Sequence, residues 1–325
     1  MELDLEDLNT VKISENDVLK EALCVANRVS MNIENNRVHQ VDKPSIKAEF
    51  SKNAMHYDSV AVVQRRIADR IVTMAISSMM ENRQEAISIL DAGCGTGYVA
   101  ARLMQILTKA INDKTINDKT SSAYSSPTNA SIELSIDMMN DPADIHLTAL
   151  DLSPAMLAQA KERSVYHVFQ QGDIEALPFS DQAFDITLSS LAIQWCHDPQ
   201  QAIAELTRVT RSKVMISTLL SGTLRELSEA FKTIDDEQHV LDFLSKAQLA
   251  ELIKPYQGHL TIYEEVMEFD SLRSLFQSLK NIGATALPAR RKGLLGRESY
   301  RKLEDYFQKL GRYQLTYVVA LIEIS

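Results

Sequence analysis

Residues 86–97 of the chain, AISILDAGCGTG, decide the fold. Their first half is a short apolar run that ends at a glycine, which is typical of a buried parallel strand entering a turn. Gly93, Gly95 and Gly97 occupy alternate positions, so the backbone can turn tightly and approach a ligand closely. A helical pattern resumes at Val99, and the free N–H groups at the start of a helix favour polar ligands. The segment therefore predicts a strand, a ligand-binding turn and a helix.

Helix-like and strand-like segments alternate along the remaining chain. We expect helices over 47–80, 99–107, 154–164, 199–210, 271–280 and 297–310, and further strands over 145–153, 164–174, 184–192, 213–220, 260–270 and 313–324. This alternation indicates an α/β fold in which an open parallel sheet carries helices on both faces. No linker separates a second domain, so we expect one decorated domain over 45–325.

Three segments are expected to decorate this domain. Residues 1–44 are mostly polar and are expected to form a partly disordered N-terminal extension. Residues 108–144 contain the tandem repeat INDKT-INDKT and a serine-rich stretch, a composition that favours a solvated surface insertion. Residues 222–258 are expected to form a helical cap, together with the N-terminal helices.

Composition and charge exclude several classes of protein. Hydrophobic residues make up 45% of the 325 residues, which is enough to bury a large core and excludes a wholly disordered chain. The net charge of −10 argues against a nucleic-acid or membrane-surface partner. Cys24, Cys94 and Cys196 are too scattered for a disulfide framework, and no residues show metal-ligand spacing. The absence of a signal peptide or a membrane-spanning stretch favours the cytoplasm.

Three acidic residues are expected at the carboxyl ends of successive strands. Asp91 precedes the glycines, Asp151 ends the next strand, and Asp173 follows the third. Each one alone is best interpreted as an ordinary strand-end or capping residue. Together they predict a ligand site, because ligands of open parallel sheets bind at this edge. A carboxylate at Asp151 can accept from both hydroxyls of a ribose, and Asp173 can accept from an adenine amino group.

These segments resemble the seven-stranded S-adenosylmethionine-dependent methyltransferases, which have a Rossmann-like fold. The strings LDAGCGTG, ALDLSPAML, GDIEALPF and FDITLSSLAIQW carry the resemblance, which covers about residues 86–220. It implies that the glycine loop approaches the methionine part of the cofactor, that Asp151 binds the ribose, and that Asp173 and Ile174 flank the adenine. The complete set of expected cofactor residues is Asp91, Gly93, Cys94, Gly95, Gly97, Asp151, Leu152, Met156, Asp173, Ile174 and Gln64. For Met156 a place in the core is an equal alternative.

A narrower resemblance extends outside the cofactor half. AEFSKNAMHYDSVAVVQRRIAD, SSLAIQWC, SLKNIGA and GRYQLTY are similar, in this order, to the malonyl-[acyl-carrier protein] O-methyltransferases of biotin synthesis. The resemblance implies methylation of the free carboxylate of a malonyl thioester, an early step towards the pimeloyl chain. The N-terminal extension, the INDKT insertion and the pair Ser212–Lys213, in place of a Pro-Gly-Gly turn, depart from the family pattern.

This reaction makes modest demands on the site. A carboxylate is already ionised at neutral pH, so no strong general base is needed. A cation should hold the substrate carboxylate, and we expect Arg312 first, for its planar fork, with Lys280 as the second candidate. Tyr57 is expected to add a hydroxyl donor, and Gln194 and Trp195 to stand at the lip of the pocket. A surface position for Arg312 and simple packing for Tyr57 are the alternatives.

A basic cluster is the candidate docking site for acyl-carrier protein. Arg290, Arg291, Lys292 and Arg297 concentrate positive charge on an otherwise acidic chain. Carrier proteins are acidic, so this cluster is expected to act on the association rate, although a merely solvated face is the alternative. Malonyl-coenzyme A remains an alternative substrate. A methyltransferase acting on a quinone or another small molecule, or a non-catalytic regulator that binds S-adenosylmethionine, are the alternative functions.

Overall fold

The computed structural model describes residues 43–53, 61–81, 86–120, 142–235, 239–281 and 296–325. Most of the expected extension over 1–44 therefore lies outside the described residues. The helices are α2 (Lys43–Asn53), α4 (Val62–Glu81), α5 (Tyr98–Thr120), α7 (Pro154–Glu162), α8 (Pro199–Arg208), α9 (Arg225–Lys232), α10 (Lys246–Ile253), α11 (Leu272–Asn281) and α12 (Arg297–Leu310), with 3-10 turns η2 (Pro142–Asp144), η3 (Ile193–Trp195) and η4 (Lys254–Tyr256). The strands are β1 (Ile87–Ala92), β2 (Ile145–Asp151), β3 (Val168–Gln171), β4 (Phe184–Ser190), β5 (Thr210–Leu219), β6 (His259–Phe269) and β7 (Tyr313–Ile324).

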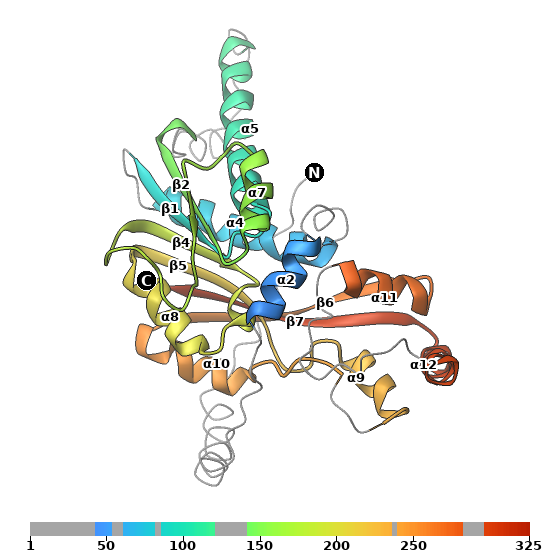
Figure 1. Ribbon diagram of the computed structural model, residues 1–325. Coiled ribbons are helices and arrows are strands. Elements are labelled where there is room, and N and C mark those ends of the chain that lie inside the picture. The colour runs from blue at the N-terminus through green and yellow to red at the C-terminus, as the bar shows by residue number, and fades with distance from the viewer. Residues whose placement is uncertain (1–42, 54–60, 82–85, 121–141, 236–238, 282–295) are drawn as a thin grey trace.

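The strands form one seven-stranded sheet in the order β3-β2-β1-β4-β5-β7-β6 (Figure 1). β1 to β5 pair in parallel, whereas β7 runs antiparallel to both β5 and β6. The α/β fold with a mostly parallel seven-stranded sheet, expected from the sequence, is confirmed. Its strand order reverses between β1 and β4, which is where open parallel sheets bind ligands.

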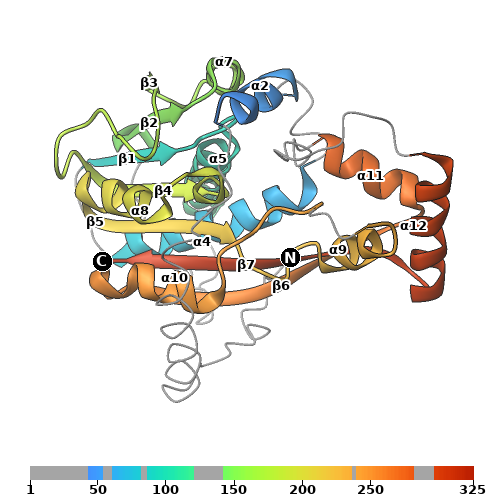
Figure 2. The ribbon, with the colours of Figure 1, turned by 60° about the horizontal axis from the view of Figure 1, so that its bottom comes forward.

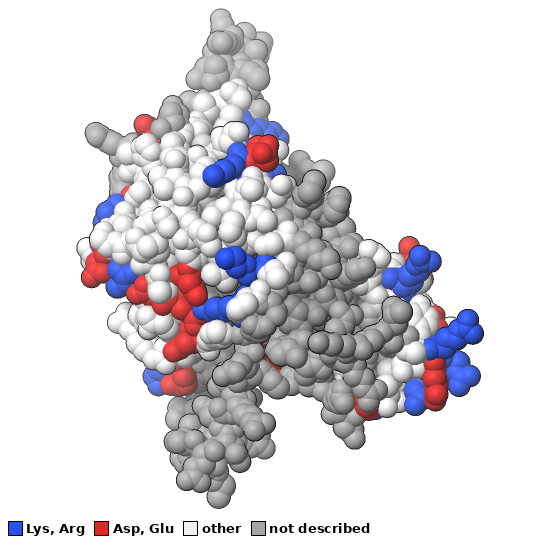
Figure 3. All heavy atoms as spheres, viewed as in Figure 1, with Lys and Arg blue, Asp and Glu red and all other residues white. Residues whose placement is uncertain are grey.

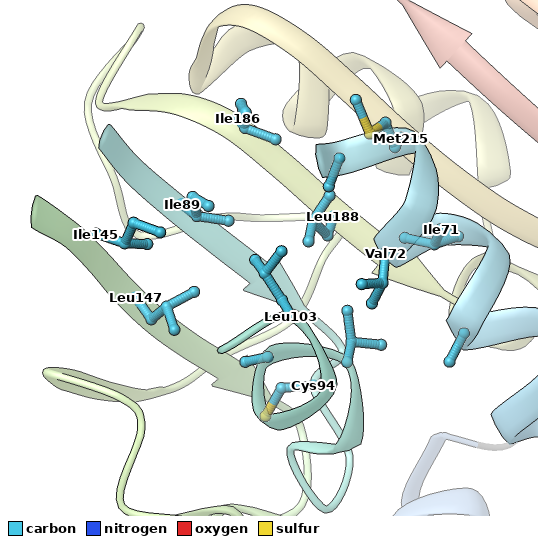
Figure 4. Close-up of a cluster of buried hydrophobic side chains, with 14 of the residues drawn as sticks. Ile71, Val72, Ile89, Cys94, Leu103, Ile145, Leu147, Ile186, Leu188 and Met215 are labelled. Atoms are coloured by element: carbon cyan, nitrogen blue, oxygen red, sulfur yellow. The ribbon is translucent and has the colours of Figure 1, made fainter. Parts of the chain in front are cut away.

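Helices cover both faces of the parallel part of the sheet. Ile89 and Leu188 pack with α4 and α5 on one face (Figure 4), and Leu90 and Ile216 pack with α8 and α10 on the other. Neighbouring residues of one strand point to opposite faces, so β1 supplies apolar side chains to both cores. This burial on two sides explains why the strand reads as a continuous apolar run rather than as an alternating one.

A third core joins α9, α11 and α12 to the far half of β7 (Figure 2). Leu303 and Phe307 of α12, Leu275 of α11 and Leu315 of β7 are buried in it. Residues 313–318 of β7 lie beyond the end of β5 and pair with β6 alone. We call this group of three helices, with the outer halves of β6 and β7, the outer lobe.

Two decorations differ from the sequence-based expectation. The helix predicted to end at Leu107 continues as α5 to Thr120, through both INDKT copies, and extends away from the sheet (Figure 1). The repeat contains no glycine or proline, so nothing in it stops a helix. The segment 222–258 contains two short helices: α9, which packs against α12 and β7 within the outer lobe, and α10, which packs against α8. Neither helix lines the cavity described below.

A buried carboxylate fixes α9 to β7. Glu226 is 6% exposed, and its carboxylate accepts hydrogen bonds from the Thr316 backbone N–H (3.0 Å), the Thr316 hydroxyl (2.5 Å) and the Gln314 amide (3.0 Å). Burial alone would raise the pKa of Glu226, but these hydrogen bonds outweigh it and lower the pKa below its ordinary 4.5. The charged form therefore stabilises the folded state.

We predict that Glu226→Gln destabilises the protein by about 1–2 kcal/mol near neutral pH, because an amide nitrogen cannot accept from the Thr316 N–H. The lowered pKa means that the stabilisation by Glu226 is complete above about pH 5 and is lost as the pH falls through the folded-state pKa. Urea unfolding at pH 7 and pH 4 measures both effects. The exposed Glu229→Gln on the same helix is the control, and equal effects of the two variants would contradict this account.

Candidate functional site

A cavity lies at the carboxyl ends of the parallel strands. Its floor is the loop between β1 and α5 together with the ends of β2, β3 and β4, and its other walls are α2, the first turns of α4 and η3. The register pairs Asp91 with Ala149 and Asp151 with Gln171, so the strand ends lie side by side. Of the residues expected to contact a cofactor, Gln64, Gly93, Cys94, Gly95, Asp151, Leu152, Met156, Asp173 and Ile174 line this cavity.

The glycine loop is tied to the end of β2. The N–H groups of Gly93 and Cys94 both donate to the carbonyl oxygen of Leu150, at 2.8 and 3.0 Å. Gly93 has φ +74°, and a Cβ there would lie 2.5 Å from the Cβ of Ala192. Gly95 also has a positive φ, but a Cβ there would meet nothing within 4 Å. Gly93 is therefore required for packing, and Gly95 leaves open space beside the backbone.

Asp151 connects the ends of two strands at the cavity wall. Its Oδ2 accepts from the Gly95 N–H at 2.9 Å, and its Oδ1 accepts from the Ser153 N–H at 2.8 Å. Burial raises the pKa of Asp151, while these two hydrogen bonds oppose the shift. Carboxylate oxygens can accept further hydrogen bonds, so Asp151 suits a ligand with hydroxyl donors.

Asp91 lies beneath the loop and does not line the cavity. Its carboxylate is 1% exposed and accepts a hydrogen bond from the Tyr166 hydroxyl at 2.6 Å. Burial raises the pKa of Asp91 to about 7, although the Tyr166 hydrogen bond lowers it in part. Gly97 is also outside the lining, and a Cβ there would lie 2.9 Å from the Tyr166 ring. These two residues support the loop from below.

The far end of the cavity contains a cluster of charges that the sequence analysis did not predict. Lys43 of α2 donates to Asp173 Oδ2 at 2.6 Å and also pairs with Glu175. The other Asp173 oxygen accepts from the Glu175 N–H at 3.1 Å. Beside this cluster Ile174 supplies a buried apolar surface. The combination of a carboxylate and an apolar wall suits a flat heterocycle with an amino group.

Helix α2 lies against this site through two further contacts. The Phe50 and Trp195 rings pack edge to face with centroids 5.5 Å apart, and the Ser51 and Ser153 hydroxyls are 2.9 Å apart. Phe50 and Trp195 both line the cavity, so Trp195 forms part of its wall. Gln194, expected at the lip, instead donates to the Leu191 carbonyl at 2.7 Å and is outside the lining.

The residues expected to bind the substrate lie elsewhere or outside the description. Arg312 is exposed on the turn between α12 and β7 and does not line the cavity. Lys280 belongs to α11, but its side chain is outside the described part of the chain, as are Tyr57 and residues 290–292. Arg297 is exposed at the start of α12.

Cys94 has a buried thiol whose pKa is raised far above its ordinary value, chiefly by burial, so it is a neutral side chain in a tight turn. Cys196 lines the same cavity, and burial raises the pKa of its thiol to about 12. Neither thiol is therefore a thiolate nucleophile at neutral pH. In the described part of the chain, no group of three or more His, Cys, Asp or Glu could hold a metal ion. No described helix is long and apolar enough to cross a membrane.

Sequence reasoning missed several lining residues: Lys43, Phe50, Arg65, Tyr98 and Leu191. Leu191 carried no signal in its residue type, but it has φ 52°, a conformation that leucine rarely adopts, directly after β4. Strained backbone of this kind gathers at ligand sites, and only the structure reveals it. Arg65 could have been suspected, because it follows the predicted Gln64 on the same helix.

Several known proteins are similar to this chain in sequence or in fold. The family model described as a methyltransferase domain matches residues 132–217. The chain is 34% identical over 284 residues to a malonyl-[acyl-carrier protein] O-methyltransferase from Hamiltonella defensa, with 86% of this chain and 93% of the relative covered. It is 34% identical to a protein of the same name from Serratia marcescens, covering 86% and 94%. A solved structure, the YcgJ protein of Bacillus subtilis, is similar at 15% identity and a TM-score of 0.47, covering 78% of this chain and 97% of that one.

We predict that Asp91→Asn flattens the pH dependence of stability. A carboxyl group whose pKa rises from 3.8 to about 7 on folding stabilises the protein fully below about pH 4, and this contribution is lost as the pH rises towards 7. Wild type should therefore lose about 2.5 kcal/mol more than the variant between pH 5 and pH 8. Urea unfolding at both pH values measures the difference, with the exposed Asp305→Asn as control. Parallel pH profiles for wild type and Asp91→Asn would contradict the buried titration.

Gly93→Ala should destabilise the protein by roughly 3 kcal/mol and abolish ligand binding at the loop, because the added methyl meets Ala192 in a left-handed backbone. Gly296→Ala, where a Cβ meets nothing within 4 Å, should leave ligand binding unchanged and cost at most about 1 kcal/mol of stability, because Gly296 is the N-cap of α12. Thermal unfolding and calorimetric titration with S-adenosylhomocysteine measure the two effects. Normal affinity in Gly93→Ala would show that the loop does not contact the ligand.

Proposed function

Because the chain belongs to the malonyl-[acyl-carrier protein] O-methyltransferases, we propose that it methylates the free carboxylate of malonyl-acyl-carrier protein to give the methyl ester. The observation that carries this proposal is the single cavity that joins the glycine loop, Asp151 and Asp173 in a chain 34% identical to these enzymes. An uncharged ester would let the enzymes of chain elongation accept a malonyl unit as a starter. We place the reaction early in biotin synthesis, in the cytoplasm.

The chain is an S-adenosylmethionine-dependent methyltransferase, and the cavity fits this methyl donor. The loop leaves open space beside Gly95, where a side chain would otherwise stand. We propose that Asp151 holds the ribose hydroxyls, that Asp173 and Ile174 hold the adenine, and that Gly93, Cys94, Gly95 and Gln64 lie along the methionine part. Leu152 and Met156 would complete the wall, and Asp91 and Gly97 would act by supporting the loop. When bound, S-adenosylmethionine supplies an activated methyl group on a sulfonium sulfur.

The reaction requires correct positioning of the substrate carboxylate and exclusion of water rather than a strong base. A malonyl carboxylate is ionised at neutral pH, so it needs no deprotonation before it attacks a methyl group. Phe50, Leu191 and Trp195 place apolar surface along the cavity, which strengthens the electrostatic interactions inside it and excludes water. The raised pKa values of Cys94 and Cys196 leave no competing thiolate nucleophile in this cavity.

Acyl-carrier protein would dock on the basic side of the outer lobe. Figure 3 shows Lys and Arg side chains over α12, and this helix contributes Arg297, Arg301, Lys302 and Lys309, with acidic residues among them. Arg290, Arg291 and Lys292 precede the helix in the sequence. We propose that these residues attract the acidic carrier and raise the association rate, an effect that salt should screen.

Incubation with labelled S-adenosylmethionine and malonyl-carrier protein tests the function, with mass analysis for one added methyl group on the malonyl unit. Acetyl-carrier protein, which lacks the free carboxylate, is the matched control and should gain no label. Label transfer to a quinone but not to the malonyl substrate would favour the alternative methyltransferase. Binding of S-adenosylmethionine without any transfer would indicate a regulator.

Charge reversal of Arg290, Arg291 and Arg297 to Glu should lower kcat/KM for malonyl-carrier protein at least tenfold and that for malonyl-coenzyme A less than threefold. The difference arises because coenzyme A does not present the acidic surface of the carrier. Steady-state kinetics at two salt concentrations measures it, and high salt should reduce the gap. Lys254→Glu on the exposed turn after α10 is the control. An equal loss on both substrates would exclude a docking role.

A further inference from the structure

Two of the described cavity-lining residues, Lys43 and Arg65, are cationic. A free carboxylate that enters a partly dry cavity needs such a group, because burying an unpaired charge is costly. The carboxylates of Asp151 and Asp173 already line the cavity, so a substrate carboxylate is unfavourable there unless a cation lies close to it. The position of the cation therefore decides where the substrate carboxylate can stand.

Lys43 is already committed to two carboxylates. It bonds Asp173 at 2.6 Å and also pairs with Glu175, and its side chain is only 17% exposed. Lys43 also lies at the end of the cavity that we assign to the adenine.

Arg65 stands on a well-packed helix that forms another part of the cavity wall. It lies in the first turn of α4, whose neighbouring residues Ile67 and Ile71 are fully buried. Two contacts to β6 fix the same helix, since Arg66 pairs with Glu265 at 2.6 Å and the Arg70 guanidinium lies 4.2 Å from the centre of the Tyr263 ring. The backbone of Arg65 is therefore held in place beside the cavity.

Another polar residue of the cavity lining is a tyrosine of α5. Tyr98 of α5 lines the cavity, and its hydroxyl donates to Asp69 Oδ1 at 3.2 Å, an oxygen that also accepts from Arg102 at 3.1 Å. Burial and Asp69 raise the pKa of Tyr98, whereas the charges of Arg102 and Arg65 oppose this shift. Asp69 therefore accepts hydrogen bonds from two residues of α5, Tyr98 and Arg102.

We propose that Arg65 binds the free carboxylate of the malonyl group and so selects a substrate that carries this charge; the inference rests on the function proposed above. A planar guanidinium can hold one edge of a carboxylate and leave a lone pair of one oxygen free. That oxygen forms the new bond to the methyl carbon as the methyl–sulfur bond breaks, and the electron pair of the broken bond stays on sulfur. No proton is transferred.

The test compares Arg65→Gln and Arg65→Lys with Arg66→Gln, a matched control on the adjacent arginine, which pairs outside the cavity. Calorimetry measures binding of malonyl-pantetheine and acetyl-pantetheine to the protein saturated with S-adenosylhomocysteine. Arg65→Gln should weaken malonyl-pantetheine binding by about 10- to 100-fold, the range for losing a hydrogen bond to a charged group. Arg65→Lys should recover part of the loss, and acetyl-pantetheine binding should not change.

The α-carboxylate of the cofactor is the other possible source of the anion, and a second arm distinguishes it. S-adenosylhomocysteine carries this carboxylate, whereas 5′-methylthioadenosine does not. Arg65→Gln should change the affinity for both compounds less than threefold. A selective loss of S-adenosylhomocysteine affinity would assign Arg65 to the cofactor and overturn the inference.

The remaining outcomes separate this inference from the proposed function. Unchanged malonyl-pantetheine binding in Arg65→Gln, or a wild type that does not prefer malonyl- over acetyl-pantetheine, would overturn the role of Arg65. A wild type that binds malonyl-pantetheine through Arg65 but transfers no methyl group would support the carboxylate site and refute the proposed reaction. Kinetics with malonyl-carrier protein should show the loss in KM more than in kcat, and thermal unfolding shows whether the variant is folded at the assay temperature.

Discussion

The carbonyl oxygen of Leu150 accepts hydrogen bonds from Gly93 and Cys94, and the rest of the site depends on this junction. It holds the glycine loop over the end of β2, so the next residue, Asp151, can reach the Gly95 N–H. The close approach of Gly93 to Ala192 brings the end of β4 to the same point. Three strand ends therefore meet at one loop, and the cavity is a consequence of their convergence.

The sequence was sufficient for the sheet and for the side of the cavity that is formed by the glycine loop and the strand ends. Every expected strand exists, because buried parallel strands are apolar runs and their ends carry glycine or aspartate in a recognisable order. The lining positions of Gly93, Asp151 and Asp173 follow from this order. The sequence pattern predicted α5 less well. The composition after residue 107 suggested a solvated surface insertion, whereas the helix continues to Thr120.

The second wall could not be predicted in the same way. Lys43 meets Asp173 across 130 residues of sequence, and no local pattern indicates such a contact. Arg65 reaches the cavity because α4 buries its Ile67 face, so its orientation is a property of the packed helix. Arg312 has the chemistry to bind a carboxylate, but the turn that carries it lies at the outer end of β7, outside the cavity lining. Residue type predicts what a side chain can do, and tertiary packing decides where it does so.

The long antiparallel pair β6–β7 has a mechanical consequence. β7 contains 12 residues and spans about 40 Å at the usual rise of a strand. Its inner half is hydrogen-bonded to β5, and its outer half carries the helices of the outer lobe, with no break between them. We expect such a continuous hydrogen-bonded ladder to resist bending, because no interruption between its halves could act as a hinge. If acyl-carrier protein docks on α12 as proposed, the length of this strand pair sets the distance from the docked carrier to the cavity. A substrate on a tethered arm of matching length is the kind that such a spacing can select.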